Sequence, residues 1–282
     1  MATPFARLLL ATEHTEFDAG AENLAMALAR HCALPLAAVL PIVSNPEFEV
    51  AAPELAARSD AQASRRREAL LEMARVQQVR LEVAVRHGSE PDAEIVQEAL
   101  QRQSDLIVIR RRGKRGFLAQ LLIGEMVSRV VAHAPCSVLI APRMAQLWTR
   151  RVLVGIDPQA PSEAALGLAA GIAADCALPL RVVCVVGTDA FRPRAEPVLA
   201  ALLQKARAIC PAADGELRSG RAHDELVQAA TTGGADLLVV ARHRDDGVRR
   251  LRIGSVAHKV IGMADCPVLV HVKPAGTAGG FT

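Results

Sequence analysis

Short, unbroken apolar runs alternate along this chain with longer stretches in which apolar residues recur every three or four positions. The runs Leu8–Thr12 and Val152–Ile156 are strand-sized and lack the alternating polar positions of a half-exposed strand, which favours parallel strands covered on both faces. The stretches 21–29 and 165–173 that follow them have the spacing of amphipathic helices. The pattern therefore predicts strands alternating with helices, and hence a doubly wound parallel sheet.

Each of these two predicted helices begins after a residue that can cap it. Asp18 precedes the first stripe and Ser162 precedes the second. The side chains of both residue types accept hydrogen bonds from N–H groups of a first helical turn. We therefore expect both residues to be N-caps.

The two halves of this alternation match each other residue by residue. Cys32–Leu36 and Cys176–Leu180 both read Cys-Ala-Leu-Pro-Leu, and the segments around them agree in pattern at the same offset of 144 positions. Asp105–Ile109 and Asp236–Val240 match at an offset of 131, so the second copy has lost about a dozen residues between these points. Such self-similarity indicates one domain present in two copies.

Each copy is predicted to contain five strands. The remaining apolar runs are Ala37–Leu40, Leu81–Val85 and Ala134–Ile140 in the first copy, and Arg181–Val186 and Ala264–Val270 in the second. We therefore predict an α/β fold with two tandem doubly wound, five-stranded parallel-sheet domains of flavodoxin-like type. Their predicted limits are residues 1–144 and 149–274.

Composition restricts the core and the partners. Apolar residues make up 51% of the chain, but aromatic residues only 2%, and Tyr is absent. The cores must therefore be aliphatic, and the chain offers no stacking platform for nucleic-acid bases. A net charge of +3 does not by itself mark a polyanion-binding surface. We expect no specific nucleic-acid partner.

The cysteines and the apolar runs favour a cytoplasmic protein. Six cysteines occur without a Cys-x-x-Cys pair, which is typical of buried thiols in a reducing compartment. The longest apolar runs are strand-sized, far short of the ~20 residues that a membrane span requires. We expect neither secretion nor a membrane location.

A metal site can be sketched but is not expected. His133 and Cys136 have the spacing of metal ligands, whereas the second copy places Met263 and Cys266 there. Neither copy supplies a second ligand pair, so we predict no metal.

Ligands of an open parallel sheet collect at the carboxyl ends of strands, where the strand order reverses. In this chain that edge lies at the ends of the first and fourth strands. The first strand runs into Glu13 in the first copy and into Asp157 in the second. Either carboxylate could accept a hydrogen bond from a ligand or cap the following turn, and the sequence leaves both open.

The fourth strand of each copy leads into a basic loop that ends at a helix. A glycine-containing loop before a helix N-terminus aims backbone N–H groups at phosphate. The loop residues that could contact a phosphate are Gly113, Gly116 and Gly124 in the first copy, and Arg242, Arg244, Gly254 and Ser255 in the second. The arginines of these loops either bind an anion or are solvated surface charge, and both interpretations remain open.

These loops and the stretch Ser255–Val270 resemble the universal stress protein family, and the resemblance spans essentially the whole chain in two copies. The motif of that family is a Gly ending strand four, two residues, Gly, nine residues, and then Gly followed by Ser or Thr. The resemblance implies the family's nucleotide-binding α-hydrolase-like fold. In ATP-binding members, phosphates lie on this motif and adenine lies near a strand-one Asp.

The second copy is the better nucleotide site by this motif. It keeps Asp157, the nine-residue spacer and Gly254–Ser255, while Ala241 and Arg244 replace the first two glycines. Ala241 would be strained if the backbone needed positive φ, and Arg244 either fills the phosphate space or grips an anion.

The first copy departs further from the motif. Arg110 stands at the first Gly position, the strand-one acid is Glu13, and the spacer is one residue longer. Glu125 follows Gly124 and would repel a phosphate on the same N–H groups. The resemblance therefore implies ATP or another adenine nucleotide as a ligand mainly of the second copy.

The resemblance implies a non-enzymatic stress-response protein in which nucleotide or anion occupancy regulates binding to an unidentified protein partner. One alternative is an interaction scaffold with vestigial sites and no nucleotide. Another is a slow ATPase or an adenylyl-transferring enzyme. The chain has no Ser-Gly-Gly loop, no His-x-x-His at the first helix and no carboxylate cluster for a metal, which disfavours the enzyme.

The resemblance also implies an assembly. Single-copy relatives commonly pair through their last strands, so the two copies are expected to form an internal pseudo-dimer in which Val138–Ala141 and Val268–Val272 lie side by side. A homodimer of the whole two-domain chain is left open.

Overall fold

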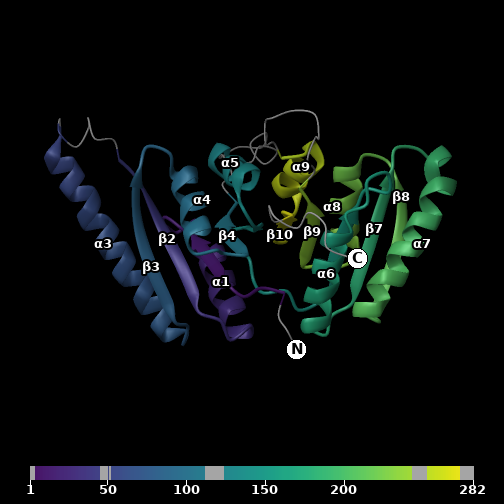
Figure 1. Cartoon of the computed structure of the whole chain (residues 1–282), viewed down its shortest axis with the longest axis horizontal. Coiled ribbons are helices and arrows are strands. Elements are labelled where there is room, and N and C mark those ends of the chain that lie inside the picture. The colour runs from purple at the N-terminus through teal and green to yellow at the C-terminus, as the bar shows by residue number, and fades with distance from the viewer. Residues whose placement is uncertain (1–3, 45–49, 51, 112–123, 243–252, 274–282) are drawn as a thin grey trace, which may run out of the picture. The chain divides into compact units, whose positions relative to one another are not determined.

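The computed structural model of the 282-residue chain describes residues 4–44, 50, 52–111, 124–242 and 253–273. These residues form two compact α/β units (Figure 1). The first domain consists of Phe5–Arg111 with Glu125–Leu147, and the second begins at Trp148.

The first domain contains a five-stranded parallel sheet with the strand order β3-β2-β1-β4-β5. Its strands are β1 (Leu8–Ala11), β2 (Leu36–Val43), β3 (Leu81–Gly88), β4 (Leu106–Arg110) and β5 (Ser137–Ala141). Its helices include α1 (Ala19–His31), α3 (Pro53–Val76), α4 (Pro91–Gln101) and α5 (Glu125–His133).

The second domain repeats this arrangement with the strand order β8-β7-β6-β9-β10. Its strands are β6 (Val152–Ile156), β7 (Leu180–Val186), β8 (Ala213–Ser219), β9 (Leu237–Ala241) and β10 (Val268–His271). Its helices include α6 (Glu163–Asp175), a short 3-10 turn η2 (Asp189–Phe191), α7 (Arg192–Ile209), α8 (Ala222–Thr232) and α9 (Ser255–Met263).

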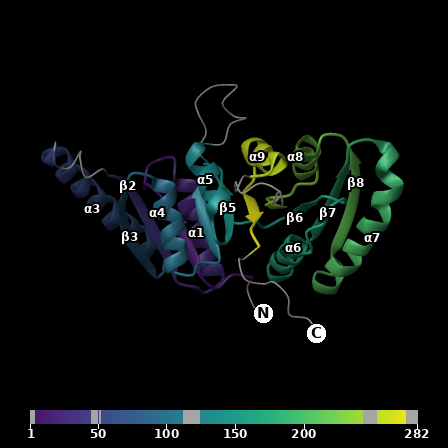
Figure 2. The same cartoon turned by 45° about the horizontal axis from the view of Figure 1, so that its top comes forward.

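Helices cover both faces of each sheet. Parallel neighbours require crossover connections, and such crossovers are right-handed. In the first domain the chain moves outward from β1 through β2 to β3 and then returns to β4 and β5, so the helices before and after the reversal lie on opposite faces. In the second domain α6 packs on α7, and α8 packs on α9. Figures 1 and 2 show the resulting helical layers.

The cores are aliphatic, as the composition predicted. Every residue of β1, β4 and β5 is buried, because helices cover both faces of the sheet. The buried side of α6 is rich in alanine, which lets this helix approach the sheet closely. None of the helices in the described part of the chain is both long and apolar enough to cross a membrane.

The sequence repeat is also a repeat of strand register. Ala11 of β1 lies opposite Val39, and its equivalent Gly155 of β6 lies opposite Val183, as the offset of 144 requires. Equivalent residues of the two copies therefore occupy equivalent places, each within its own sheet.

The predicted α/β fold, with two tandem doubly wound five-stranded parallel sheets, is confirmed. The predicted domain limits, 1–144 and 149–274, remain predictions. So does the side-by-side placement of Val138–Ala141 and Val268–Val272.

The two predicted helix caps have different outcomes. Ser162 caps α6, because its hydroxyl oxygen accepts a hydrogen bond from the backbone N–H of Ala165 at 3.3 Å. Asp18 lies at the predicted N-cap position of α1, but its side chain bonds no N–H of that helix, so only the expected capping hydrogen bond was wrong. Its carboxylate instead accepts hydrogen bonds from the backbone N–H and the hydroxyl of Thr15.

Gly20 of α1 provides a test of close packing in the first domain. A Cβ atom at this position would lie 2.2 Å from the carbonyl oxygen of Pro142 and 2.5 Å from that of Arg143. Because backbone yields less readily than a side chain, we expect Gly20→Ala to lower the free energy of unfolding by about 1–3 kcal/mol. Urea unfolding followed by circular dichroism measures this change.

Gly171→Ala in α6 is the matched control. A Cβ atom there meets nothing within 4 Å, so the higher helix propensity of Ala should raise stability by up to about 1 kcal/mol. Equal stability of Gly20→Ala and the wild type would contradict the proposed steric constraint.

Glu98 of α4 is a buried carboxylate held between two arginines. It is 4% exposed and accepts hydrogen bonds from Nε of Arg86 at 2.7 Å and from Nε of Arg102 at 2.5 Å. Burial raises the pKa of this carboxyl, but the bonds from Arg102 and Arg86 outweigh burial, and the net effect is a pKa below the ordinary value.

This geometry predicts how stability depends on pH. A carboxyl whose pKa is lower in the folded state stabilises the protein above its unfolded pKa, and that stability is lost as the pH falls. Glu98→Gln should therefore cost stability at neutral pH, and the difference from the wild type should shrink between roughly pH 5 and pH 3. Thermal unfolding across this range measures it. Glu72→Gln, at an exposed pair with Arg75, should show a much smaller difference. A Glu98→Gln deficit that is constant with pH would contradict the assignment.

Candidate ligand-binding site

A cavity of about 410 Å³ opens at the carboxyl edge of the second sheet. It lies where the ends of β6, β7 and β9 meet the first turns of α8 and α9. The strand order reverses between β6 and β9, which is the position where doubly wound sheets bind ligands. The volume suits a small organic molecule.

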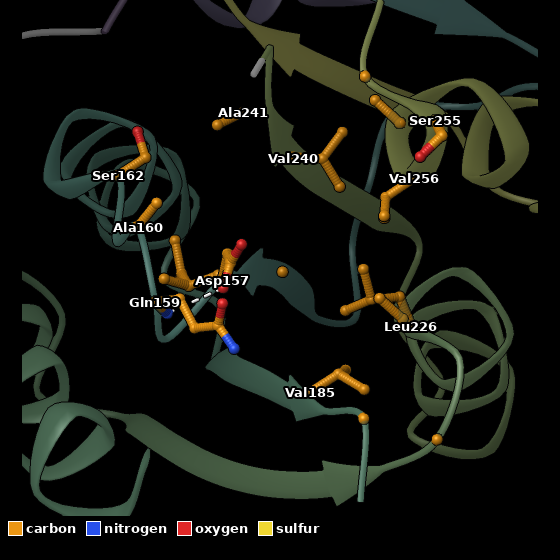
Figure 3. Close-up of a pocket in the computed structure, with 17 residues that line it drawn as sticks. Asp157, Gln159, Ala160, Ser162, Val185, Leu226, Val240, Ala241, Ser255 and Val256 are labelled. Carbon is orange, nitrogen blue, oxygen red and sulfur yellow. Dashed lines mark hydrogen bonds between the residues drawn. The ribbon is translucent and has the colours of Figure 1, made fainter. Parts of the chain in front are cut away.

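The cavity has mostly apolar walls and few polar groups. Apolar side chains on its walls include Val185, Leu226, Val240 and Val256. Its polar side chains are Asp157, Gln159, Ser162 and Ser255. Figure 3 places Asp157 and Gln159 across the cavity from Ser255 and Val256. An apolar slot with polar groups at its ends suits a flat ligand with polar substituents.

Asp157 presents a carboxylate to this cavity. Its Oδ1 accepts a hydrogen bond from the backbone N–H of Gln159 at 2.8 Å, which holds the turn after β6 (Figure 3). The side chain is exposed, and within the described part of the chain Oδ2 accepts no hydrogen bond. The two roles that the sequence left open are thus served by different oxygens: Oδ1 caps the turn, and Oδ2 can accept from a ligand.

The charge of Asp157 also affects the thiol of Cys184 on β7. Burial, and then the negative charge of Asp157, raise the pKa of the Cys184 thiol to about 12. Cys184 therefore remains a neutral thiol at physiological pH and is not a nucleophile.

The first turn of α9 forms the opposite side of the cavity. Gly254 is its N-cap, and Ser255, Val256 and Ala257 line the cavity. N–H groups in the first turn of a helix have no partner inside the helix and carry the positive end of the helix dipole. This side of the cavity therefore suits a phosphate or another oxygen-rich group.

The equivalent place in the first domain is almost completely filled. The hollow there has a volume of about 10 Å³. Each of the nine residues that line it has its repeat equivalent in the wall of the second-domain cavity; Glu13 corresponds to Asp157, for example, and Ile95 to Leu226. The two domains carry one site in a closed and an open form.

Arg110 fills the first-domain site. It ends β4 at the position equivalent to Ala241 and is only 6% exposed. Its Nη2 donates to Oε2 of Glu13 at 2.8 Å, and its Nη1 donates to the hydroxyl oxygen of Thr15 at 3.1 Å. Its Nε lies 3.2 Å from Oδ1 of Asp18. The guanidinium occupies space that Ala241 leaves open in the other copy.

A second polar network closes the end of β1. The carboxylate of Glu22, a residue only 2% exposed, accepts a hydrogen bond from the hydroxyl of Thr12 at 2.6 Å and lies 3.0 Å from Nδ1 of His14. The equivalents of these residues in the second domain are Ile156, Pro158 and Leu166. The network is therefore a feature of the first copy.

The predicted residues of the second copy have different outcomes. Asp157, Gly254 and Ser255 line the cavity. Arg242 follows β9 without lining the cavity; its positive charge, together with the larger effect of burial, lowers the pKa of His271. Arg244 lies outside the described residues.

The predicted residues of the first copy do not form an open site. Glu13 is bound to Arg110, and Gly124, directly before α5, does not line the small hollow. Gly113 and Gly116 lie outside the described residues. Glu125, expected to disfavour phosphate, forms an ion pair with Arg129 at 2.8 Å.

Gln159 and the apolar wall were missed by sequence reasoning. These residues lie on separate strands and helices that meet only at the sheet edge. One signal was present in the sequence. The first copy has Arg110 at the end of strand four with Glu13 and Asp18 after strand one, whereas the second copy has Ala241 with Asp157 and Ser162 at the equivalent positions.

A family model and a curated relative both relate this chain to the same protein family. The family model described as Universal stress protein family matches residues 4–142 and 149–273. The chain is 29% identical over 176 residues to universal stress protein Slr1230 of Synechocystis sp., a match that covers 61% of this chain and 59% of that relative. The chain thus spans less than two thirds of the length of this curated relative.

One solved structure that covers nearly the whole chain supports the same fold. A universal stress protein from Archaeoglobus fulgidus DSM 4304 superposes with a TM-score of 0.72 at 17% identity, covering 94% of this chain and 97% of that one. The universal stress protein from Archaeoglobus fulgidus in complex with dAMP is 25% identical, with a TM-score of 0.36, and covers 44% of this chain and 98% of that one.

The comparison of the two domains predicts that one substitution closes the open cavity. In Ala241→Arg, we expect the introduced guanidinium to contact the Asp157 carboxylate, because the equivalent Arg110 contacts Glu13. A crystal structure of the variant should show the volume reduced from about 410 Å³ toward the 10 Å³ of the first domain. A guanidinium directed into solvent, above an unchanged cavity, would contradict this prediction.

Proposed function

Since this chain belongs to the universal stress protein family, we propose that it is a non-enzymatic stress-response protein whose second domain binds one adenine nucleotide per chain. Occupancy of that domain regulates the binding of a protein partner. The first domain contributes structure and takes no nucleotide.

The observation that carries this proposal is the difference between the two equivalent sites. The second domain holds about 410 Å³ of open volume at the switch point of its sheet, and the first domain holds about 10 Å³. A nucleoside requires a cavity of several hundred Å³, so only the larger site can accept one.

The lining of the cavity matches the parts of a nucleotide. A purine base is flat and apolar on its faces, which suits a cavity lined by apolar side chains such as Leu226 and Val240. Its exocyclic amine, or a ribose hydroxyl, can donate to Oδ2 of Asp157. A phosphate meets the free N–H groups at the start of α9.

The lining favours binding over catalysis. Phosphoryl transfer requires a metal ion held by carboxylates and a positioned base or water. Among the described residues that line the cavity, Asp157 is the one carboxylate, and its Oδ1 already holds a turn. We therefore favour a binding function over a slow ATPase activity.

Occupancy can reach a partner because the site lies at an exposed edge. Asp157, Gln159 and Ser255 are all exposed. A ligand that contacts both the loop after β6 and the start of α9 changes the surface presented at that edge. A partner that binds the ligand-bound and ligand-free surfaces with different affinity therefore responds to occupancy. The scaffold without nucleotide is the alternative.

Titration calorimetry of the whole chain with ATP and with AMP tests the proposal. We expect one nucleotide per chain. Ala241→Arg should weaken binding by tenfold or more, because the added side chain occupies the base pocket. Ala212→Arg is the matched control, since Ala212 is exposed at the opposite, amino edge of the same sheet, before β8, and should bind like the wild type.

The outcomes separate the hypotheses. Two nucleotides per chain would contradict the proposal that the first domain takes none. Equal binding by Ala241→Arg and the wild type would remove the second-domain cavity as the site. A chain that binds neither nucleotide would support the scaffold.

A further inference from the structure

We propose that the hollow at the carboxyl edge of the first sheet is a built site for a guanidinium cation, which the chain fills with its own Arg110. The first domain is thereby self-liganded. This inference does not depend on whether the second domain binds nucleotide.

The site surrounds the guanidinium with acceptors on three of its nitrogens. Nη2 meets Glu13 at 2.8 Å, Nη1 meets Thr15 at 3.1 Å, and Nε lies 3.2 Å from Oδ1 of Asp18. Two carboxylates and a hydroxyl therefore face one delocalised cation. A planar fork of N–H donors fits such a set, whereas a point charge would satisfy only part of it.

Two of the acceptors, Asp18 and Thr15, hold each other in place without help from Arg110. The Asp18 carboxylate is 1% exposed, and its Oδ2 accepts from the backbone N–H of Thr15 at 2.9 Å and from its hydroxyl at 2.6 Å. Its Oδ1 is buried and makes no aligned hydrogen bond, so this oxygen is directed at the cation by charge alone. Removal of the arginine side chain should leave a preformed acidic socket.

Burial makes this socket selective. A buried carboxylate without a cation is costly, so the socket favours occupation by positive charge. It should reject a phosphate for the same reason. In the second domain the residues equivalent to Glu13, Thr15 and Asp18 are Asp157, Gln159 and Ser162. That site keeps a single carboxylate and has no arginine at the end of its fourth strand.

Self-occupation has a functional consequence. A tethered side chain competes at an effective concentration on the order of millimolar or higher, so free cations at lower concentration do not displace it. The first domain is then insensitive to ligands, and any response of the chain to a small molecule comes from the second domain.

Chemical rescue tests the assignment. Arg110→Ala removes the side chain beyond Cβ, and ethylguanidinium replaces the atoms lost. We expect the variant to unfold at a lower temperature than the wild type, and ethylguanidinium to raise that temperature saturably while leaving the wild type unchanged. n-Propylammonium, which has the charge without the fork, should bind about tenfold more weakly.

Two further variants separate the socket from a general loss of stability. Arg110→Ala combined with Asp18→Asn should lose the rescue, because an acceptor is neutralised. Arg110→Lys keeps the charge and most of the stem, so it remains informative if Arg110→Ala does not fold. It should unfold between Arg110→Ala and the wild type and should not respond to ethylguanidinium.

Three results would overturn the proposal. One is an Arg110→Ala variant as stable as the wild type, and another is equal stabilisation of variant and wild type by ethylguanidinium. The third is binding of a second ATP per chain by Arg110→Ala, which would make the hollow a blocked nucleotide site. The nucleotide titration of the wild type tests the second-domain site, and the rescue of Arg110→Ala tests the first-domain site. Failure of one proposal therefore does not contradict the other.

Discussion

Burial of both faces of a parallel sheet is the constraint on which this molecule depends. Helices cover the strands on each side, so their residues must be aliphatic and their backbone groups must pair within the sheet. On the central strands, such as β1, β4 and β5, polar side chains are then confined to the strand ends. At the carboxyl edge, helix N-termini add unpaired N–H groups, which makes this edge a natural place to bind something. Glu13 and Arg110 in the first domain and Asp157 in the second lie at this edge.

Duplication allowed the two copies to meet this constraint in different ways. In the first, Arg110 and two carboxylates fill the strand ends, with Thr15 bonded to both Asp18 and Arg110. Buried ion pairs are costly to desolvate, and these further hydrogen bonds offset that cost. In the second copy, Ala241 removes the cation, Ser162 becomes an ordinary helix cap, and the cavity stays open. A difference of a few side chains changes the volume from about 10 to about 410 Å³.

The proposed function gives the two halves of the chain different tasks. Under the proposed function, a domain that supplies its own cation has one state, whereas a domain with an open apolar cavity and an exposed carboxylate has a ligand-bound and a ligand-free state. Regulation by a ligand needs two states that differ in affinity for a partner. The second domain can supply them, and the first is a constant neighbour of the same fold.

The sequence by itself determined the duplication, the strand and helix order, the aliphatic core and the strand-end acids. Apolar periodicity is a local signal, and the repeat is found by comparing the sequence with itself, so neither requires knowledge of the tertiary structure. It also singled out Asp157 and Gly254–Ser255, which line the cavity of the second domain. Only the tertiary structure decided that Asp18 faces Arg110 rather than capping α1, and that Leu226 and Val240 build a wall with Asp157 at its end. The physical reason is that both arrangements depend on distances between segments that are far apart in the chain. These segments meet at one sheet edge, where their side chains share the same space and interact through their charges.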